Sequence, residues 1–191
     1  MPQAEPALTE QQGARLVRLA RSALNAAVGA PSLGHESDAD LQRLGATFVT
    51  LTQAGQLRGC IGSLQAHRPL AEDVRNNAVA AALHDPRFAP VTAQEAPRLL
   101  VEVSVLTSPM PLSYTGQAHA LQQLQPGVDG VVFECVYQGR KHRSTFLPQV
   151  WEQLPEVATF MAHLKAKAGL APDFWSPEVQ LSVYRVQKFL E

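Results

Sequence analysis

The apolar residues near the start of the chain recur three and four positions apart, which predicts an amphipathic helix. The helix is expected to begin at Thr9, because Thr9 and Gln12 form a capping-box pattern, and to end before Pro31. Its predicted apolar stripe consists of Leu16, Leu19, Ala20, Ala23, Leu24 and Ala27. A second helix is predicted from Pro69, which suits a first helical turn, to His84. Between the two helices, residues 30–38 have the Gly, Pro, Ser and Asp content of a loop.

Most of the remaining apolar segments are rich in β-forming residues, which predicts strands. The predicted strands are residues 46–52, 56–64, 99–106, 131–137, 142–147 and 180–186. Two pairs are joined by turn dipeptides, Ala54-Gly55 and Gln138-Gly139, so we expect two hairpins. Short helices are predicted at 116–124, 148–154 and 156–167, and the Thr92/Glu95 capping box predicts a further helical turn. This irregular order favours an α+β fold with largely antiparallel sheets flanked by helices and two subdomains. Because no repeat or long linker interrupts the chain, we expect residues 1–191 to form a single domain.

Composition and charge narrow the class of protein. The 191 residues are 46% hydrophobic and 17% charged, which is typical of a soluble globular protein. The net charge of −1 makes nucleic acid or an anionic membrane surface an unexpected partner. The basic cluster at 140–143 is interpreted as a solvated hairpin end, with a phosphate-binding patch as the alternative. We expect neither a signal peptide nor a membrane span. The two cysteines, Cys60 and Cys135, lack C-x-x-C spacing, which favours a reducing, cytoplasmic location.

The segment Leu57-Arg58-Gly59-Cys60-Ile61-Gly62 carries the most distinctive candidate chemistry. It places a cysteine between two glycines and near an arginine, inside a predicted strand. In a regular strand, Arg58, Cys60 and Gly62 share one face, while Gly59 and Ile61 share the other. Two interpretations stay open: a reactive thiol in a site shaped by the glycines, or a small buried residue in a closely packed strand.

A second candidate segment begins at the end of the helix predicted at 69–84. His84 is interpreted either as a base or as a residue that suits a helix C-terminus. The two prolines of Asp85-Pro86-Arg87-Phe88-Ala89-Pro90 predict a stiff, extended stretch. Asp85 and Arg87 are either members of a site or a structural ion pair.

Several ordered motifs together resemble one known family, the AMMECR domain family. The motifs are residues 57–62, Asn77-Ala78, Asp85-Pro86-Arg87-Phe88, Pro97-Arg98-Leu99, residues 102–106, Gly127-Val128-Asp129-Gly130, residues 145–151, residues 165–170 and residues 184–189. The resemblance covers nearly the whole chain, and the prokaryotic branch of the family is called AmmeMemoRadiSam system protein A. It implies an α+β fold with two interlocked subdomains around a cleft. The activity of the family is not established, and the system name implies two partners: a Memo-like protein, similar to metal-dependent extradiol dioxygenases, and a radical S-adenosylmethionine enzyme.

Two functional hypotheses follow for this chain. In the first, the protein is an accessory or substrate-binding component, in which Arg58 and Arg87 recognise a carboxylate or phosphate while Gly59 and Gly62 leave room for it. Phe88, Phe146 and Trp151 then either supply apolar walls or belong to the core. In the alternative, the protein is an enzyme whose cleft uses Cys60 as nucleophile, with His84 and Asp85 as further catalytic residues.

Neither a metal nor a cofactor is expected. The six histidines, His35, His67, His84, His119, His142 and His163, are scattered along the chain. Their spacing gives no ligand set of the kind that helices or hairpins provide. The usual motifs for dinucleotides, P-loop phosphates, zinc peptidases and serine hydrolases are also missing from the sequence.

Overall fold

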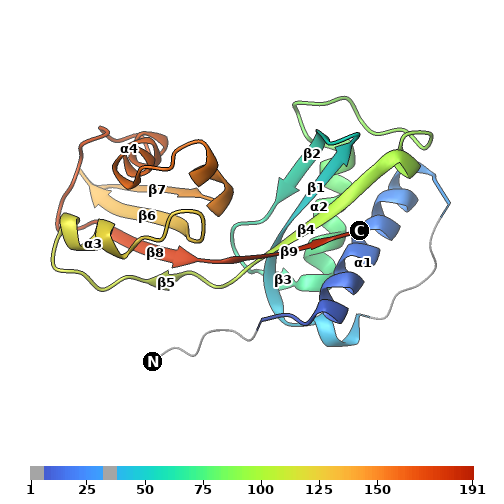
Figure 1. Cartoon of the computed structure of the whole chain (residues 1–191), viewed down its shortest axis with the longest axis horizontal. Coiled ribbons are helices and arrows are strands. Elements are labelled where there is room, and N and C mark those ends of the chain that lie inside the picture. The colour runs from blue at the N-terminus through green and yellow to red at the C-terminus, as the bar shows by residue number, and fades with distance from the viewer. Residues whose placement is uncertain (1–6, 32–37) are drawn as a thin grey trace. The chain divides into compact units, whose positions relative to one another are not determined.

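The structure, a computed structural model, describes residues 7–31 and 38–191, and the chain divides into two compact units (Figure 1). Unit 1 contains the described residues up to Ser108 together with Gln187–Glu191. Unit 2 is Pro109–Val186. Unit 1 is therefore completed by a strand that follows unit 2 in the sequence. Most of the loop predicted at 30–38, and His35 within it, lies outside the described residues.

Unit 1 combines two α-helices with a sheet. The helices are α1 (Glu10–Val28) and α2 (Leu70–Leu83), with the short 3-10 helices η1 (Ala39–Leu41) and η2 (Ala96–Arg98). The strands are β1 (Leu44–Gln53), β2 (Gln56–Gly62), β3 (Arg68–Pro69), β4 (Leu99–Leu106) and β9 (Val186–Leu190). Their order is β2-β1-β4-β9, with β3 paired to β1, and β1 runs antiparallel to β2, β3 and β4. Strand β2 therefore lies at an edge of the sheet.

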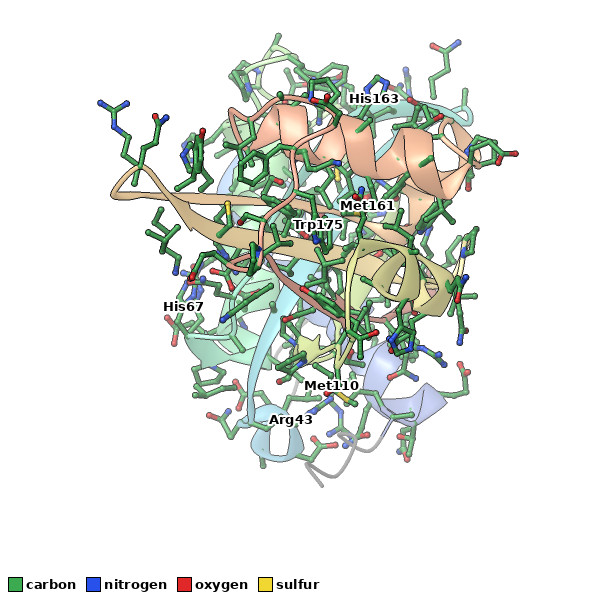
Figure 2. The ribbon with its side chains drawn as sticks, turned by 90° about the vertical axis from the view of Figure 1, so that its left-hand side faces the viewer. Arg43, His67, Met110, Met161, His163 and Trp175 are labelled. Carbon is green, nitrogen blue, oxygen red and sulfur yellow. The ribbon has the colours of Figure 1, made fainter. Side chains whose placement is uncertain are left out.

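Unit 2 is a smaller antiparallel sheet with its own helices. Its strands, in the order β5-β8-β6-β7, are β5 (Met110–Pro111), β8 (Gln180–Tyr184), β6 (Gly130–Tyr137) and β7 (Arg140–Phe146). Its helices are α3 (Gln117–Gln123), η3 (Pro148–Glu152) and α4 (Val157–Lys167). The Trp151 and Phe160 rings stack with centroids 3.6 Å apart in the core. From α4, Met161 faces the sheet and is buried, whereas His163 lies on the outer, exposed side of the helix (Figure 2).

The α+β class with antiparallel sheets is confirmed, with local differences. The capping box at Thr9 is present: the Gln12 N–H donates to Thr9 Oγ1, and the Thr9 N–H donates to the Gln12 side chain. The strand predicted at 180–186 is divided at Arg185 into β8 and β9, and the helix predicted at 148–154 is the shorter 3-10 helix η3. The two-residue strands β3 and β5 were not predicted, because two residues show no alternation. At the β6–β7 hairpin the basic residues Lys141 and Arg143 both pair with Glu134.

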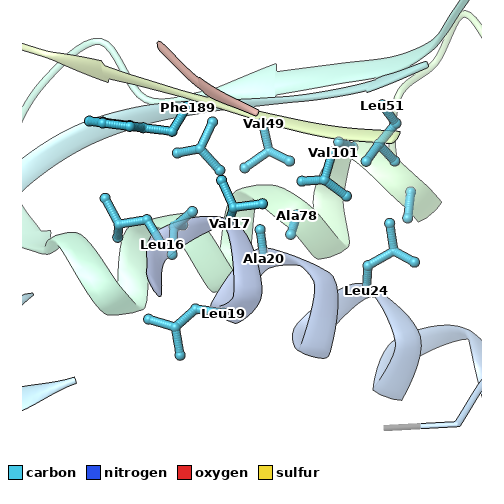
Figure 3. Close-up of a cluster of buried hydrophobic side chains, with 14 of the residues drawn as sticks. Leu16, Val17, Leu19, Ala20, Leu24, Val49, Leu51, Ala78, Val101 and Phe189 are labelled. Atoms are coloured by element: carbon cyan, nitrogen blue, oxygen red, sulfur yellow. The ribbon is translucent and has the colours of Figure 1, made fainter. Parts of the chain in front are cut away.

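The core of unit 1 lies between its two helices and one face of its sheet (Figure 3). Leu16, Val17, Ala20 and Leu24 reach this core from α1, and Ala78 reaches it from α2. The sheet contributes every second residue of its central strands: Val49 and Leu51 from β1, Val101 and Val103 from β4. The residues between them, such as Thr50 and Glu102, therefore belong to the face away from the helices.

Helix α2 approaches strand β2 closely at Gly59. A Cβ atom added to Gly59 would lie 2.2 Å from the main-chain carbonyl oxygen of Ala81, on α2. Because that oxygen belongs to the helix backbone, it cannot move aside as a side chain does. Gly59 therefore has a packing role that sets the distance between helix and strand.

A buried carboxylate joins α2 to the sheet. Asp73 has no solvent exposure, and it accepts hydrogen bonds from the Thr47 N–H (2.8 Å) and the Thr47 hydroxyl (2.7 Å) of β1. It also accepts from the Ser63 hydroxyl (2.7 Å), from Arg68 Nε (2.8 Å) and from Asn77 Nδ2 (3.0 Å). Five donors, one of them the cationic Arg68, thus compensate for the removal of this charge from water.

We expect Asp73→Asn to destabilise the fold by about 3–5 kcal/mol, because Arg68 loses its ionic partner and the new amide group has no acceptor in place. Urea denaturation followed by circular dichroism measures the change. Asp40→Asn is the matched control, since Asp40 pairs with Arg15 at an exposed position, where the expected loss is about 0–1 kcal/mol. Equal losses in the two variants would contradict the structural role of the Asp73 network.

We expect Gly59→Ala to cost about 1–3 kcal/mol, because the added methyl group forces α2 away from β2. Gly116→Ala is its control: Gly116 has an extended backbone and nothing within 4 Å of an added Cβ. Thermal unfolding of both variants tests the difference. An unchanged melting temperature for Gly59→Ala would show that the strand has room at this position.

Candidate functional site

Cys60 lies on edge strand β2, on the face of the sheet away from the helices. The register places Cys60 opposite Thr50 and Gly62 opposite Phe48, while Gly59 is opposite the buried Leu51. The prediction that Cys60 and Gly62 lie on one face of the strand and Gly59 on the other is therefore confirmed.

The prediction that Arg58 shares the face of Cys60 in a regular strand is wrong. Leu51 pairs with Gly59 but Thr52 pairs with Leu57, so Arg58 is an extra residue in a β-bulge. The bulge interrupts the alternation between Arg58 and Cys60. It also explains how Arg58 reaches a partner outside the sheet.

Asp85, two residues beyond α2, holds the backbone of Cys60. The Cys60 N–H donates to Asp85 Oδ2 at 2.9 Å, and the Cys60 carbonyl accepts from Arg87 Nη2 at 3.3 Å. The sequence predicted an extended stretch at residues 85–90, and this prediction is wrong at its start. The chain turns there, because the Phe88 N–H donates to the Asp85 carbonyl at 3.1 Å. The turn lets Asp85 and Arg87 bind the same strand residue from one side.

The Asp85–Arg87 pair is tightly hydrogen-bonded. Arg87 donates from Nε to Asp85 Oδ1 (3.0 Å), from Nη2 to Oδ2 (2.7 Å) and from its main-chain N–H to Oδ1 (3.1 Å). The side-chain hydrogen bonds from Arg87 hold the pKa of Asp85 well below its usual range, although burial acts in the opposite direction. The Cys60 and Arg87 N–H groups lower this pKa further. Asp85 therefore stays ionised and fixes the position of the guanidinium.

Arg87 itself is half-exposed, with a side-chain exposure of 54% against 2% for Asp85. Its Nη1 makes no hydrogen bond to any described residue, so it is open to an added acceptor. The Phe88 ring lies beside the guanidinium, whose Cζ is 5.4 Å from the ring centroid. The hydrogen bonds to Asp85 raise the pKa of Arg87, and the negative charge of a Cys60 thiolate acts in the same direction.

The thiol of Cys60 is half-buried and has one polar neighbour, the Thr50 hydroxyl, at 3.3 Å from Sγ. Cys135, the other cysteine, is also a free thiol, but it is buried in the core of unit 2, and burial raises its pKa. Of the two cysteines, Cys60 is therefore the more exposed.

The structure brings some of the predicted site residues together and leaves others apart. Arg58 binds Glu95 through Nε (3.2 Å) and Nη2 (3.3 Å), so its guanidinium is already occupied by a carboxylate. Hydrogen bonds from Thr92 and then from Arg58 lower the pKa of Glu95. The imidazole of His84 is exposed and makes no hydrogen bond to Cys60, Asp85 or any other described residue.

Gly62 and the predicted aromatic residues have packing roles. A Cβ at Gly62 would overlap the Phe48 ring, at 2.2 Å from its nearest atom. Phe146 and Trp151 belong to the core of unit 2, where both pack against Phe160. Phe88 alone among the three aromatics lies beside a candidate site residue.

Sequence reasoning missed two residues of this neighbourhood, Thr50 and Glu95. Glu95 was visible only as the end of a capping box, which is present as hydrogen bonds between Thr92 and Glu95. Nothing in that local pattern indicates that the same carboxylate also binds an arginine 37 positions earlier. The contact of Thr50 with the thiol depends on strand register, which a sequence pattern does not give directly.

Within the part of the chain that the structure describes, no three His, Cys, Asp or Glu side chains gather in a way that would hold a metal ion. No helix among those residues has the length and apolarity needed to cross a bilayer. The candidate site itself consists of the half-exposed guanidinium of Arg87, held by Asp85 and by the carbonyl of Cys60, whose thiol contacts the Thr50 hydroxyl. Such a group binds an anionic oxygen through charge-assisted hydrogen bonds.

Comparison with known proteins gives the family of the chain. The sequence profile of AMMECR1 matches residues 17–189. A protein of Methanothermobacter thermautotrophicus is 37% identical over 190 residues, covering 96% of both chains. Protein MJ0810 of Methanocaldococcus jannaschii is 34% identical over 94% of this chain and 89% of its own length.

A solved structure shares the fold over almost the whole length. The crystal structure of uncharacterized protein PH0010 from Pyrococcus horikoshii superposes with a TM-score of 0.80 at 31% identity, covering 96% of this chain and 93% of the other. The profile match spans most of the sequence, and the relatives exceed 30% identity over nearly full length. The chain therefore belongs to the AMMECR1 family.

Proposed function

We propose that this protein is a cytoplasmic binding or accessory component that holds a small anionic molecule at Arg87. In this proposal it acts together with a Memo-like protein and a radical S-adenosylmethionine enzyme, the partners implied by the family resemblance. The observation that carries the proposal is the geometry of Arg87, which Asp85 and the Cys60 carbonyl orient while Nη1 stays open.

Arg87 supports this role better than Arg58 does. Glu95 binds Arg58 through Nε and Nη2, just as Asp85 binds Arg87, but the Arg58 side chain is only 16% exposed, against 54% for Arg87. The more buried guanidinium gives an incoming anion less access. At Arg87 the anion adds to the existing ion pair without breaking it, because Asp85 contacts Nε and Nη2 only.

The neighbours of Arg87 define the ligand further. Phe88 offers an apolar surface beside the cation, and Cys60 and Thr50 offer a thiol and a hydroxyl near each other. A molecule with a carboxylate or phosphate at one end and a small apolar part fits this set of groups. Its role would be presentation to a partner enzyme, which requires no base within this chain.

The second candidate function is an enzyme that uses Cys60 as nucleophile. The observation in its favour is that the accessible thiol lies in the field of the Arg87 cation and 3.3 Å from the Thr50 hydroxyl. The proposed base, His84, is not hydrogen-bonded to the thiol, and both oxygens of Asp85 are occupied by backbone and guanidinium donors. This geometry favours the accessory role over the catalytic one.

Asp85 must be ionised to hold Arg87, which gives a pH dependence. Its pKa is lowered in the folded state relative to about 3.9 in an unfolded chain. The resulting stabilisation is therefore present above about pH 4 and is lost as the pH falls toward the folded-state pKa of Asp85.

We expect Asp85→Asn to be less stable than the wild type by about 2–3 kcal/mol at pH 7, and this difference in stability to narrow only below about pH 4. Denaturant unfolding of both proteins from pH 7 to pH 2.5 measures the difference; a difference that stays constant down to pH 2.5 would show that folding leaves the pKa of Asp85 unchanged.

We expect Arg87→Gln to weaken the binding of inorganic phosphate and of acetate, used as probes, by about tenfold or more, because a charge-assisted hydrogen bond is lost. Titrations followed by NMR of the Arg87 side chain and the Cys60 amide measure this. Arg75→Gln is the control, since Arg75 also pairs with an aspartate, Asp38, through its Nη1. A wild type without saturable shifts, or an Arg87→Gln variant with unchanged affinity, would refute the anion site.

An assay that contains both partner proteins distinguishes the two candidate functions. Metabolite profiles of the three-protein mixture are compared for wild type, Arg87→Gln and Cys60→Ser. The accessory role requires turnover to fall with Arg87→Gln and to persist with Cys60→Ser. Turnover that is abolished by Cys60→Ser, in a variant whose melting temperature is unchanged, would instead establish Cys60 as the nucleophile.

A further inference from the structure

Strand β7 forms an edge of the sheet in unit 2, because it pairs with β6 and with no other described strand (Figure 1). The hairpin turn is Gln138-Gly139, whose φ angles of 49° and 73° are those of a type I′ turn. Such a turn makes Tyr137 and Arg140 a hydrogen-bonded pair, so every second residue from Arg140 turns its main-chain groups toward β6. The residues between them turn their main-chain groups outward: Lys141, Arg143 and Thr145.

This edge is covered at one end and open at the other. The carbonyl of Thr145 accepts a hydrogen bond from Lys167 Nζ at 2.9 Å. The outward N–H and C=O of Lys141 have no hydrogen-bond partner among the described residues, and residues 136–141 around them are exposed. The edge is therefore able to accept a further strand at Lys141.

Positive charge gathers at the open end. Arg140, Lys141 and Arg143 place three cations within four positions. The carboxylate of Glu134 is shared by two of them, Lys141 Nζ at 3.1 Å and Arg143 Nε at 3.2 Å. Arg140 makes no hydrogen bond or ion pair with any described residue, and the Lys141 side chain is 69% exposed. In a chain of net charge −1, this local excess of cations favours an acidic partner.

Exposed apolar side chains lie beside these cations on both faces of the hairpin. Val136, which is 55% exposed, is opposite Lys141 on one face, and Tyr137, which is 42% exposed, is opposite Arg140 on the other. The Tyr137 ring packs against Phe174 with ring centroids 4.9 Å apart. Exposed apolar surface next to unneutralised charge is typical of an interaction surface.

We propose that the open end of β7 binds an extended acidic segment of a partner protein, which adds to the sheet of unit 2 as a further strand. The partner's main chain pairs with the N–H and C=O of Lys141. An acidic residue of the partner lies opposite Lys141, and the next residue, also acidic, lies opposite Arg140 on the other face. This proposal is independent of the anion site at Arg87.

The charge and the main-chain geometry together exclude the other occupants of such an edge. A second copy of β7 would bring its own cations against Lys141 and Arg140, and like charges directly opposite each other destabilise a strand pair. Nucleic acid would supply phosphates for the cations but no peptide groups for the N–H and C=O of Lys141. An acidic strand satisfies both.

The probe is a short peptide of threonine and valine with two adjacent glutamates at its centre and blocked termini. One control peptide has glutamines in place of the glutamates, and a second carries methyl groups on the main-chain nitrogens of both glutamates. Titrations of the full chain followed by NMR are expected to show saturable shifts at Lys141 and its neighbours, with a dissociation constant of about 0.1–1 mM, as is usual for a short flexible peptide. Exchange of the Lys141 amide hydrogen is expected to slow at saturation, because this N–H enters a hydrogen bond between the chains.

Three variants test the named contacts. Lys141→Gln and Arg140→Gln are each expected to weaken binding of the glutamate peptide about two- to fivefold, through the loss of one exposed ion pair. Lys141→Pro is expected to weaken it about tenfold or more, because the outward N–H is lost as well. An edge strand tolerates a proline whose nitrogen faces solvent, so the β6–β7 pairing is kept. Lys188→Gln is the control, since Lys188 also lies on an edge strand, β9, and also pairs with a glutamate, Glu102, at 3.6 Å.

Each outcome supports or overturns the proposal. Equal affinity for the glutamine peptide would refute the acidic partner, and equal affinity for the methylated peptide would refute strand addition. No saturable shifts with the glutamate peptide, or an equal loss in Lys188→Gln, would refute the site. Oligothymidylate that binds the same residues as tightly as the glutamate peptide would overturn the proposal in favour of a nucleic-acid surface. Thermal unfolding is measured for every variant, and the two glutamine variants decide the test if Lys141→Pro does not fold.

Discussion

The arrangement of unit 1 depends on one buried carboxylate, Asp73. A charge with no solvent exposure is tolerated only where donors surround it, and here the donors come from β1, from the end of β2, from β3 and from α2 itself. The network fixes both the position and the rotation of α2 on the sheet. Gly59 adds a second constraint, because its lack of a side chain lets the helix backbone at Ala81 approach the strand. The two together place the C-terminal end of α2 beside the edge of β2.

That placement is what assembles the candidate site. Asp85 follows α2 by two residues, so it reaches the Cys60 amide 25 positions earlier in the chain. The site is thus a consequence of how a helix end meets a strand edge, and its rigid part is the backbone of Cys60. The Cys60 thiol and the exposed side of the Arg87 guanidinium are held by fewer contacts than that backbone. This division suits the proposed binding of an anion at Arg87.

Local patterns predicted the elements well and the site only in part. The capping box at Thr9 and the alternation of Cys60 with Gly59 depend on neighbours in sequence, so both were predictable. The bulge at Arg58 was not, because it depends on how β2 pairs with β1, and it changed the partner of that arginine. His84 stood out by its residue type, yet its imidazole points to no site partner. Contacts such as Arg21 with Glu191, 170 positions apart, follow only from the assembled sheet, in which the C-terminal strand β9 lies beside β4.

The hydrogen bonds around Cys60 also bear on how the protein behaves in a crowded solution. β2 is an edge strand, and the outward N–H and C=O groups of an edge are where another chain can add a strand and start aggregation. At Cys60 both groups are already occupied, the N–H by Asp85 and the carbonyl by Arg87. A foreign strand would have to break the hydrogen bonds from Asp85 and Arg87 to the Cys60 backbone to dock there. The pair that orients the guanidinium thus also keeps this edge of the sheet closed to self-association.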